Sequence, residues 1–158
     1  MRRLYLILSL IFSVLSTVMM PHNMRNFIVT NYNLGNGLAT NKIFDAAQDS
    51  LGRMWFATGY GVSLYDGYKW ENFNLNSGGN TTGFKKIIID SKGIKWLISC
   101  ITTYGLKVNR GTGWTDVSID PATNEKPEYV TGADIIYRNG KPLLVITTHD
   151  HLYILNDK

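Results

Sequence analysis

Short runs of alternating apolar and polar residues, broken by glycine and aspartate, dominate the chain beyond residue 22. Alternation with a period of two predicts half-buried β-strands, and the breaks predict tight turns, where aspartate side chains bond following amides and glycines take a positive φ. Between residues 43 and 73 the pattern predicts four antiparallel strands. They are Ile43–Gln48, Arg53–Thr58, Val62–Tyr65 and Trp70–Phe73.

The same pattern returns further along the chain. The octapeptide Asp49-Ser50-Leu51-Gly52-Arg53-Met54-Trp55-Phe56 recurs 41 positions later as Asp90-Ser91-Lys92-Gly93-Ile94-Lys95-Trp96-Leu97. Each copy continues through a glycine, a short alternation and a turn to a second tryptophan, Trp70 or Trp114. A third copy, between residues 135 and 157, lacks both tryptophans. Four short strands repeated about every 40 to 50 residues indicate propeller blades.

The predicted fold is therefore all-β, a partial β-propeller of four-stranded antiparallel blades. Two blades are complete, at about 37–73 and 78–117, and a third at about 129–158 is incomplete. We expect Trp55 and Trp96 to pack where blades meet, and Trp70 and Trp114 to cover the rim. Propellers close with typically four to eight blades, so we expect the chain to be the N-terminal part of a longer protein or to associate. An open third blade would expose an apolar face and strand edges.

The N-terminal segment has a different pattern. Arg2 and Arg3 are followed by the uncharged, mostly apolar stretch Leu4–Met20. A basic start followed by an apolar run predicts an export signal, or alternatively an uncleaved N-terminal anchor, within residues 1–22. Either would place residues 23–158, the predicted partial propeller, outside the cytoplasm.

Composition adds limits to this picture. The 158 residues are 44% apolar and 18% charged, which is ordinary for a globular domain. Without the first 22 residues, the chain has 14 basic and 12 acidic side chains, a net charge of +2. These charges are scattered along the chain and give no reason to expect nucleic-acid binding. The single cysteine, Cys100, excludes an internal disulfide.

Three segments carry a resemblance to a known family. Asn36-Gly37-Leu38, the Asp49-x-x-Gly52-x-x-Trp55-Phe56-Ala57-Thr58 stretch and Gly61-Val62-x-Leu64-Tyr65-Asp66-Gly67 resemble the two-component regulator propeller repeat. The likeness is close over residues 34–73, good over 83–117 and loose in the third copy. It implies an extracytoplasmic sensor region of a bacterial sensor histidine kinase or hybrid two-component system, periplasmic or extracellular, with kinase activity only in a longer parent protein.

Ligand contacts are expected in the loops that join the second strand to the third and one blade to the next, because these loops emerge on one face. The candidate ligand-binding residues are Asn41, Lys42, Tyr60, Tyr104, His149 and Asp150. Aromatic rings stack on sugar C–H faces, and amide and hydroxyl groups pair with sugar hydroxyls, so a neutral oligosaccharide fits them. The resemblance also implies glycan inputs. The same residue types are, however, common in any loop.

No catalytic residue, metal site or cofactor is predicted. Turn chemistry explains Asp49, Asp66 and Asp90. Expected partners are a small molecule or oligosaccharide, the remaining blades of a longer chain and a second copy in a homodimer, with membrane contact only through the N-terminal segment or regions of the parent beyond this sequence. Two alternatives stay open. One is a fragment of a propeller lyase or hydrolase using Lys42, His149 and Asp150, and the other is a structural or adhesive propeller assembling with other chains.

Overall fold

The computed structural model of this chain describes residues 28–75, 83–99, 105–119, 125–127 and 129–156. The predicted export signal or anchor at residues 1–22 lies outside these ranges. The chain divides into two units, residues 1–31 and 32–158, and every described strand belongs to the second unit. Among the described residues, no helix has the length and apolar character needed to cross a membrane.

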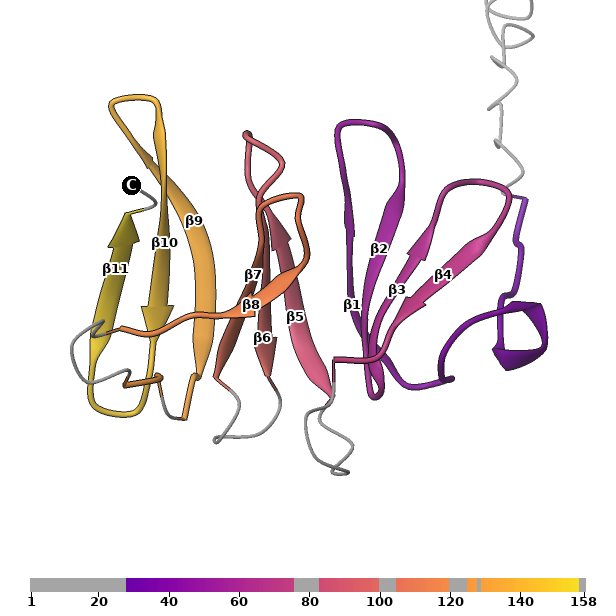
Figure 1. Cartoon of the computed structure of the whole chain (residues 1–158), viewed down its shortest axis with the longest axis horizontal. Helices are drawn as coiled ribbons and strands as arrows, with labels where there is room; N and C mark the ends of the chain where they lie inside the picture. Colours follow the sequence, from indigo (N-terminus) through magenta and orange to yellow (C-terminus); the bar gives the residue numbers. More distant parts are fainter. Residues whose placement is uncertain (1–27, 76–82, 100–104, 120–124, 128, 157–158) are drawn as a thin grey trace, which may run out of the picture. The chain divides into compact units, whose positions relative to one another are not determined.

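The strands of the second unit form three antiparallel sheets, which we call blades 1, 2 and 3 (Figure 1). Blade 1 contains β1 (Ile43–Gln48), β2 (Met54–Thr58), β3 (Gly61–Tyr65) and β4 (Trp70–Phe73). Blade 2 contains β5 (Phe84–Ile89), β6 (Lys95–Ser99), β7 (Leu106–Asn109) and β8 (Trp114–Asp116). Blade 3 contains β9 (Gly132–Arg138), β10 (Lys141–Thr147) and β11 (Leu152–Asn156). The all-β partial propeller predicted from the sequence, with two four-stranded blades and an incomplete third, is confirmed.

The repeated octapeptide builds the turn between the first two strands of a blade. Asp49 Oδ1 accepts the backbone N–H groups of Leu51 and Arg53, each at 3.0 Å. Its Oδ2 accepts Arg53 Nε at 2.8 Å and the buried Trp55 Nε1 at 2.9 Å. In blade 2, Asp90 Oδ1 likewise accepts the N–H groups two and four residues further on. The aspartate is therefore a structural part of the turn, as its position predicts.

The hydrophobic core lies between the blades. Trp55, Val62 and Leu64 of blade 1 pack against Phe84 and Leu97 of blade 2. A second cluster joins blades 2 and 3, with these members: Ile88, Ile94, Trp96, Ile98, Leu106, Val108, Ala133, Leu144 and Ile146. Each blade thus buries one face on its neighbour, and the interblade positions predicted for Trp55 and Trp96 are confirmed.

Residues 32–41 cover the outer face of blade 1, the face turned away from blade 2. This segment contains the short 3-10 helix η1 (Leu34–Asn36). Gly37 has φ 108° and lies so close to Trp70 that an added Cβ would be 2.9 Å from the ring Cδ1. Leu38 is buried, and the Tyr32 ring meets the Trp70 ring edge-on at 5.5 Å. The Asn36-Gly37-Leu38 motif is therefore a cover for this sheet face.

Side chains of β1 and β5, the inner strands of blades 1 and 2, bond each of these blades to the next. Asp45 Oδ2 on β1 accepts the backbone N–H of Ile87 on β5 at 3.0 Å. Lys86 Nζ on β5 donates to the backbone carbonyl of Ala133 on β9 at 2.7 Å. In β1 and β5 the strand register shifts beside this position, between Ile43 and Asp45 and between Phe84 and Lys86. A bulge there re-aims the side chain toward the next blade.

Candidate functional site

The turn between β10 and β11 carries two of the predicted ligand-binding residues, His149 and Asp150. Thr148 N donates to the His151 carbonyl at 2.9 Å, and His151 N donates to Thr148 Oγ1 at 3.0 Å. These bonds close a tight turn at whose tip His149 and Asp150 are exposed. The turn thus presents both residues at the end of the β10–β11 hairpin.

Beside this turn lies a hollow of about 240 Å³, which we call the blade 3 pocket. It is formed by the connection from β8 to β9, the β10–β11 turn and the start of β11. Its lining residues are Glu125, Lys126, Tyr129, Thr148, His149, Asp150, His151 and Tyr153. The structure therefore brings His149 and Asp150 together with aromatic and charged groups from a second segment of the chain.

Two pairs of aromatic rings form the walls of this pocket. The Tyr129 ring meets His149 edge-on, with centroids 5.8 Å apart and an angle of 68° between the ring planes. The His151 and Tyr153 rings are stacked at 5.7 Å with an angle of 30°. Flat rings in both orientations offer faces and edges to an apolar or C–H-rich ligand surface.

Tyr129 has an unusual backbone conformation, with φ 48°. A residue with a Cβ in this left-handed region costs roughly 1–2 kcal/mol relative to the ordinary helical region. Just beyond it, Thr131 N donates to the Thr147 carbonyl at 2.7 Å, which fastens the connection to β10. Strained, bulky residues that persist in a fold tend to lie at binding sites, so the position of this ring is a reason to look for a ligand here.

The charged groups of the pocket differ in their surroundings. Lys126 Nζ lies 2.8 Å from Asp116 Oδ2, and Lys107 Nζ bonds the other oxygen of the same carboxylate. Burial raises the pKa of Asp116, but the hydrogen bonds from Lys107 and Lys126 outweigh it and hold that pKa below its ordinary value. The Lys126 ammonium is thus paired with Asp116, while Glu125 and Asp150 each add a carboxylate to the lining of the pocket. Such a lining disfavours anionic ligands and suits ligands rich in hydroxyl donors.

The other predicted ligand-binding residues lie elsewhere. Asn41 Oδ1 accepts the N–H of Leu34 at 3.0 Å, and the Lys42 carbonyl accepts the N–H of Gly59 at 2.9 Å. The Tyr60 hydroxyl lies 3.3 Å from Asn74 Nδ2. Asn41, Lys42 and Tyr60 all belong to the surroundings of blade 1 and do not line the blade 3 pocket. Tyr104 lies outside the described residues.

Sequence reasoning missed six of the pocket residues, which are Glu125, Lys126, Tyr129, Thr148, His151 and Tyr153. Three of them lie in the connection from β8 to β9, which has no counterpart of similar sequence in the first two copies of the repeat. Tyr153 faces blade 2, where the alternation predicts a packing residue. Among the described residues, no group of three or more His, Cys, Asp or Glu side chains is arranged to hold a metal ion.

Comparison with known proteins shows what this arrangement resembles. No protein-family model matches the chain, and none of the curated proteins matches it. Among solved structures it is similar to the extracellular domain of the putative hybrid two-component system BT3049 from B. thetaiotaomicron. The TM-score is 0.63 and the identity 19%, over 83% of this chain and 19% of that one.

A second similar structure is PorZ, an essential bacterial surface component of the type-IX secretion system of Porphyromonas gingivalis. Here the TM-score is 0.52 and the identity 15%, over 72% of this chain and 17% of that one. This chain therefore spans less than a fifth of the length of either structure. At such identities the likeness is one of fold, and it supports the assignment of the chain as a set of propeller blades.

Proposed function

We propose that this chain is the N-terminal part of an exported propeller sensor domain of a two-component system, and that it binds the end of a neutral oligosaccharide in the blade 3 pocket. The observation that carries the proposal is the pairing of aromatic walls with carboxylate and hydroxyl groups around a strained Tyr129. The sequence supports export, because Arg2 and Arg3 precede an uncharged stretch. The similarity to an extracellular domain and to a surface component agrees with a periplasmic or extracellular location.

The chemistry of the pocket suits a sugar unit. The C–H faces of a sugar ring stack on Tyr129 or Tyr153, while its hydroxyls donate to Asp150 and Glu125. Pockets that enclose a drug-sized ligand usually measure about 300–1,000 Å³. At about 240 Å³ the blade 3 pocket suits one terminal unit of a longer ligand.

Of the three residues considered for the lyase or hydrolase alternative, Lys42 is separated from His149 and Asp150, and this separation favours binding without chemistry. Lys42 lies beside Gly59 in blade 1, whereas His149 and Asp150 lie in the β10–β11 turn of blade 3. An acid and a base must both come within hydrogen-bond reach of the reacting group. In a longer parent, we propose, ligand binding is passed to a histidine kinase output.

Glycan-array binding by the purified chain tests the proposal. We expect wild type to retain one class of neutral glycans, and Tyr129→Ala and His149→Ala to bind them roughly tenfold more weakly, which corresponds to about 1.4 kcal/mol. Tyr60→Ala is the matched control, because it removes an exposed loop aromatic away from the pocket. Loss of binding in Tyr60→Ala with unchanged binding in His149→Ala would contradict the pocket assignment, and an array without any bound glycan would contradict the ligand class.

A further inference from the structure

The outer face of blade 3, the face turned away from blade 2, is an apolar sheet surface. Leu144 and Ile146 on β10 belong to the core with blade 2, so the alternate residues Leu143 and Val145 point the other way. Their cross-strand partners share this outer face. The apolar members of the face are Ile136, Leu143, Val145, Leu152 and Ile154, and they share it with Gly132, Asp134, Arg138, Lys141, Thr147 and Asn156. Ile136, Leu152 and Ile154 are 45%, 62% and 57% exposed, a cluster of large apolar side chains open to solvent.

This face repeats the faces through which blades 1 and 2 pack on their successors. The matching is given by strand register on the inner strands. Asp45 on β1 pairs with Ala57, Lys86 on β5 pairs with Ile98, and Asp134 on β9 pairs with Val145. Trp55 precedes Ala57 by two residues, and Trp96 precedes Ile98 by two residues. Leu143 holds the same position relative to Val145 in blade 3. The outer face of blade 3 is therefore the third member of a series whose first two members are both covered by a blade.

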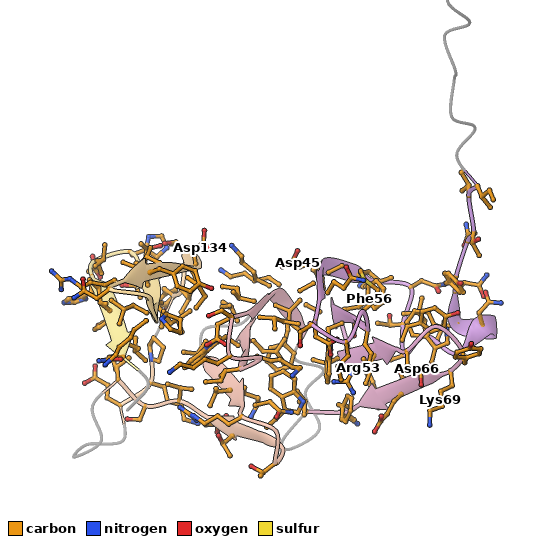
Figure 2. All side chains as sticks on the ribbon, turned by 90° about the horizontal axis from the view of Figure 1, so that it is seen from above. Asp45, Arg53, Phe56, Asp66, Lys69 and Asp134 are labelled. Atoms are coloured by element: carbon orange, nitrogen blue, oxygen red, sulfur yellow. The ribbon has the colours of Figure 1, made fainter. Side chains whose placement is uncertain are left out.

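The inner-strand residue of each covered face bonds to the backbone of the next blade. Asp45 Oδ2 accepts the Ile87 N–H at 3.0 Å, and Lys86 Nζ donates to the Ala133 carbonyl at 2.7 Å. The Asp45 carboxylate thus binds a backbone N–H of the next blade, and the Lys86 ammonium group binds a backbone carbonyl. Asp134, the third in the series, is exposed, and its Oδ1 accepts only the adjacent Ile135 N–H, at 2.8 Å, among the bonds described. Figure 2 shows Asp45 and Asp134 along the same edge of the blades.

We propose that the outer face of blade 3 is the docking surface for a further antiparallel blade, and that Asp134 accepts a backbone N–H from the inner strand of that blade. The contact continues an interface that the chain already forms twice. An incoming blade supplies what this face needs, an apolar sheet surface for Ile136 and Ile154 and a backbone donor for the carboxylate. A second copy of the chain, held through the same apolar surface, is the competing occupant that the test must exclude.

The chain itself offers a blade for the test. A copy of residues 67–119, appended after Lys158, supplies a fourth strand for blade 3 and then a second copy of blade 2. Blade 2 carries the Ile87 N–H group, which binds the Asp45 side chain of blade 1 in the original chain. We expect the extended chain to be a more stable monomer than the original. We also expect the amides of β11 to exchange with deuterium at least tenfold more slowly, since the added blade covers Leu152 and Ile154.

Asp134→Ala tests the carboxylate in both chains. It is expected to raise the unfolding equilibrium constant about tenfold or more in the extended chain and to leave it nearly unchanged in the original chain. Asp45→Ala is the matched control, because its Ile87 bond exists in both chains and its effect should be the same in each. An equal effect of Asp134→Ala in the two chains, or an extension that gains neither stability nor protection of β11, would overturn the proposal. So would a dimer of the original chain that Ile154→Lys dissociates, since the occupant would then be a second copy.

Discussion

The substitution Asp49→Ala examines the claim that the repeated octapeptide is a structural element. It removes all four hydrogen bonds of the carboxylate, two from backbone N–H groups and two from the side chains of Arg53 and Trp55. Asp66→Ala is the matched control. Asp66 also accepts two backbone N–H groups in a turn, those of Tyr68 and Lys69, but it is exposed and has no indole partner (Figure 2).

The expected loss follows from burial. A hydrogen bond to a charged group contributes about 1.5–3 kcal/mol net of the competing bonds to water, and a buried donor left without a partner costs about 1–3 kcal/mol. Water reaches the freed backbone groups of an exposed turn, whereas Trp55, only 4% exposed, keeps its indole N–H in a dry environment. We therefore expect Asp49→Ala to lower the free energy of unfolding by about 3–4 kcal/mol. Asp66→Ala should cost about 1 kcal/mol.

Urea unfolding followed by circular dichroism measures both values, with tryptophan fluorescence as a second probe. Trp55→Phe keeps an aromatic ring beside Phe73 but removes the N–H together with the five-membered ring of the indole. A double-mutant cycle with Asp49→Ala therefore separates the coupling between Asp49 and the indole from the packing cost of the smaller ring. A positive coupling of about 1 kcal/mol or more is expected from that bond. An Asp49→Ala cost no larger than that of Asp66→Ala, together with zero coupling, would refute the reasoning.

Three further predictions follow from the same geometry. Burial raises the pKa of Asp49, but its hydrogen bonds, first that from Trp55, hold this pKa below the ordinary value. The contribution of the Asp49 carboxylate to the free energy of unfolding is therefore complete above about pH 4 and is lost as pH falls through the lowered pKa of the folded state. Acid unfolding curves of wild type and Asp49→Asn should converge at low pH, and curves that stay parallel would count against this. Gly37→Ala should cost more than Gly67→Ala by about 1 kcal/mol or more, since both glycines have φ near 100° but only Gly37 adjoins Trp70; equal melting temperatures would disagree. Tyr129→Gly should leave the free energy of unfolding unchanged or raise it by up to about 1 kcal/mol, because it relieves the left-handed strain, while weakening glycan binding; a large destabilisation would show that the ring is a packing residue.

The strands could be predicted from sequence because they depend on local patterns. The alternation of apolar and polar residues predicts both ends of Ile43–Gln48 and Trp70–Phe73 correctly. The observed β2 and β3 differ from the predicted strands by one residue at their first position. The turn role of Asp49 could be predicted because its backbone partners lie within four residues. The bond from Trp55 Nε1 to Asp49 follows from the way β2 folds back on the turn, which no periodicity encodes.

The candidate site was only partly predictable. His149 and Asp150 were found because they interrupt two apolar alternations and so must form a turn. Tyr129 joins them from a connection without a repeat counterpart, and its conformation depends on tertiary contacts. Asn41 has the composition of a ligand-binding residue, yet its side chain bonds the N–H of Leu34 in the segment that covers blade 1. The bonds of Asp45 and Lys86 to the next blade also depend on tertiary packing.

Histidine side chains offer the most direct test of the blade 3 pocket. The chain has three histidines, and two of them, His149 and His151, line the pocket. In a chain labelled with ¹⁵N at histidine and at the tryptophan indole, titration with the glycan identified on the array should shift both imidazole signals with one saturation curve. The Trp55 indole signal should stay in place, because Trp55 is packed between blades 1 and 2 and does not line the pocket. A titration that shifts the Trp55 signal and leaves His149 and His151 unmoved would contradict the account.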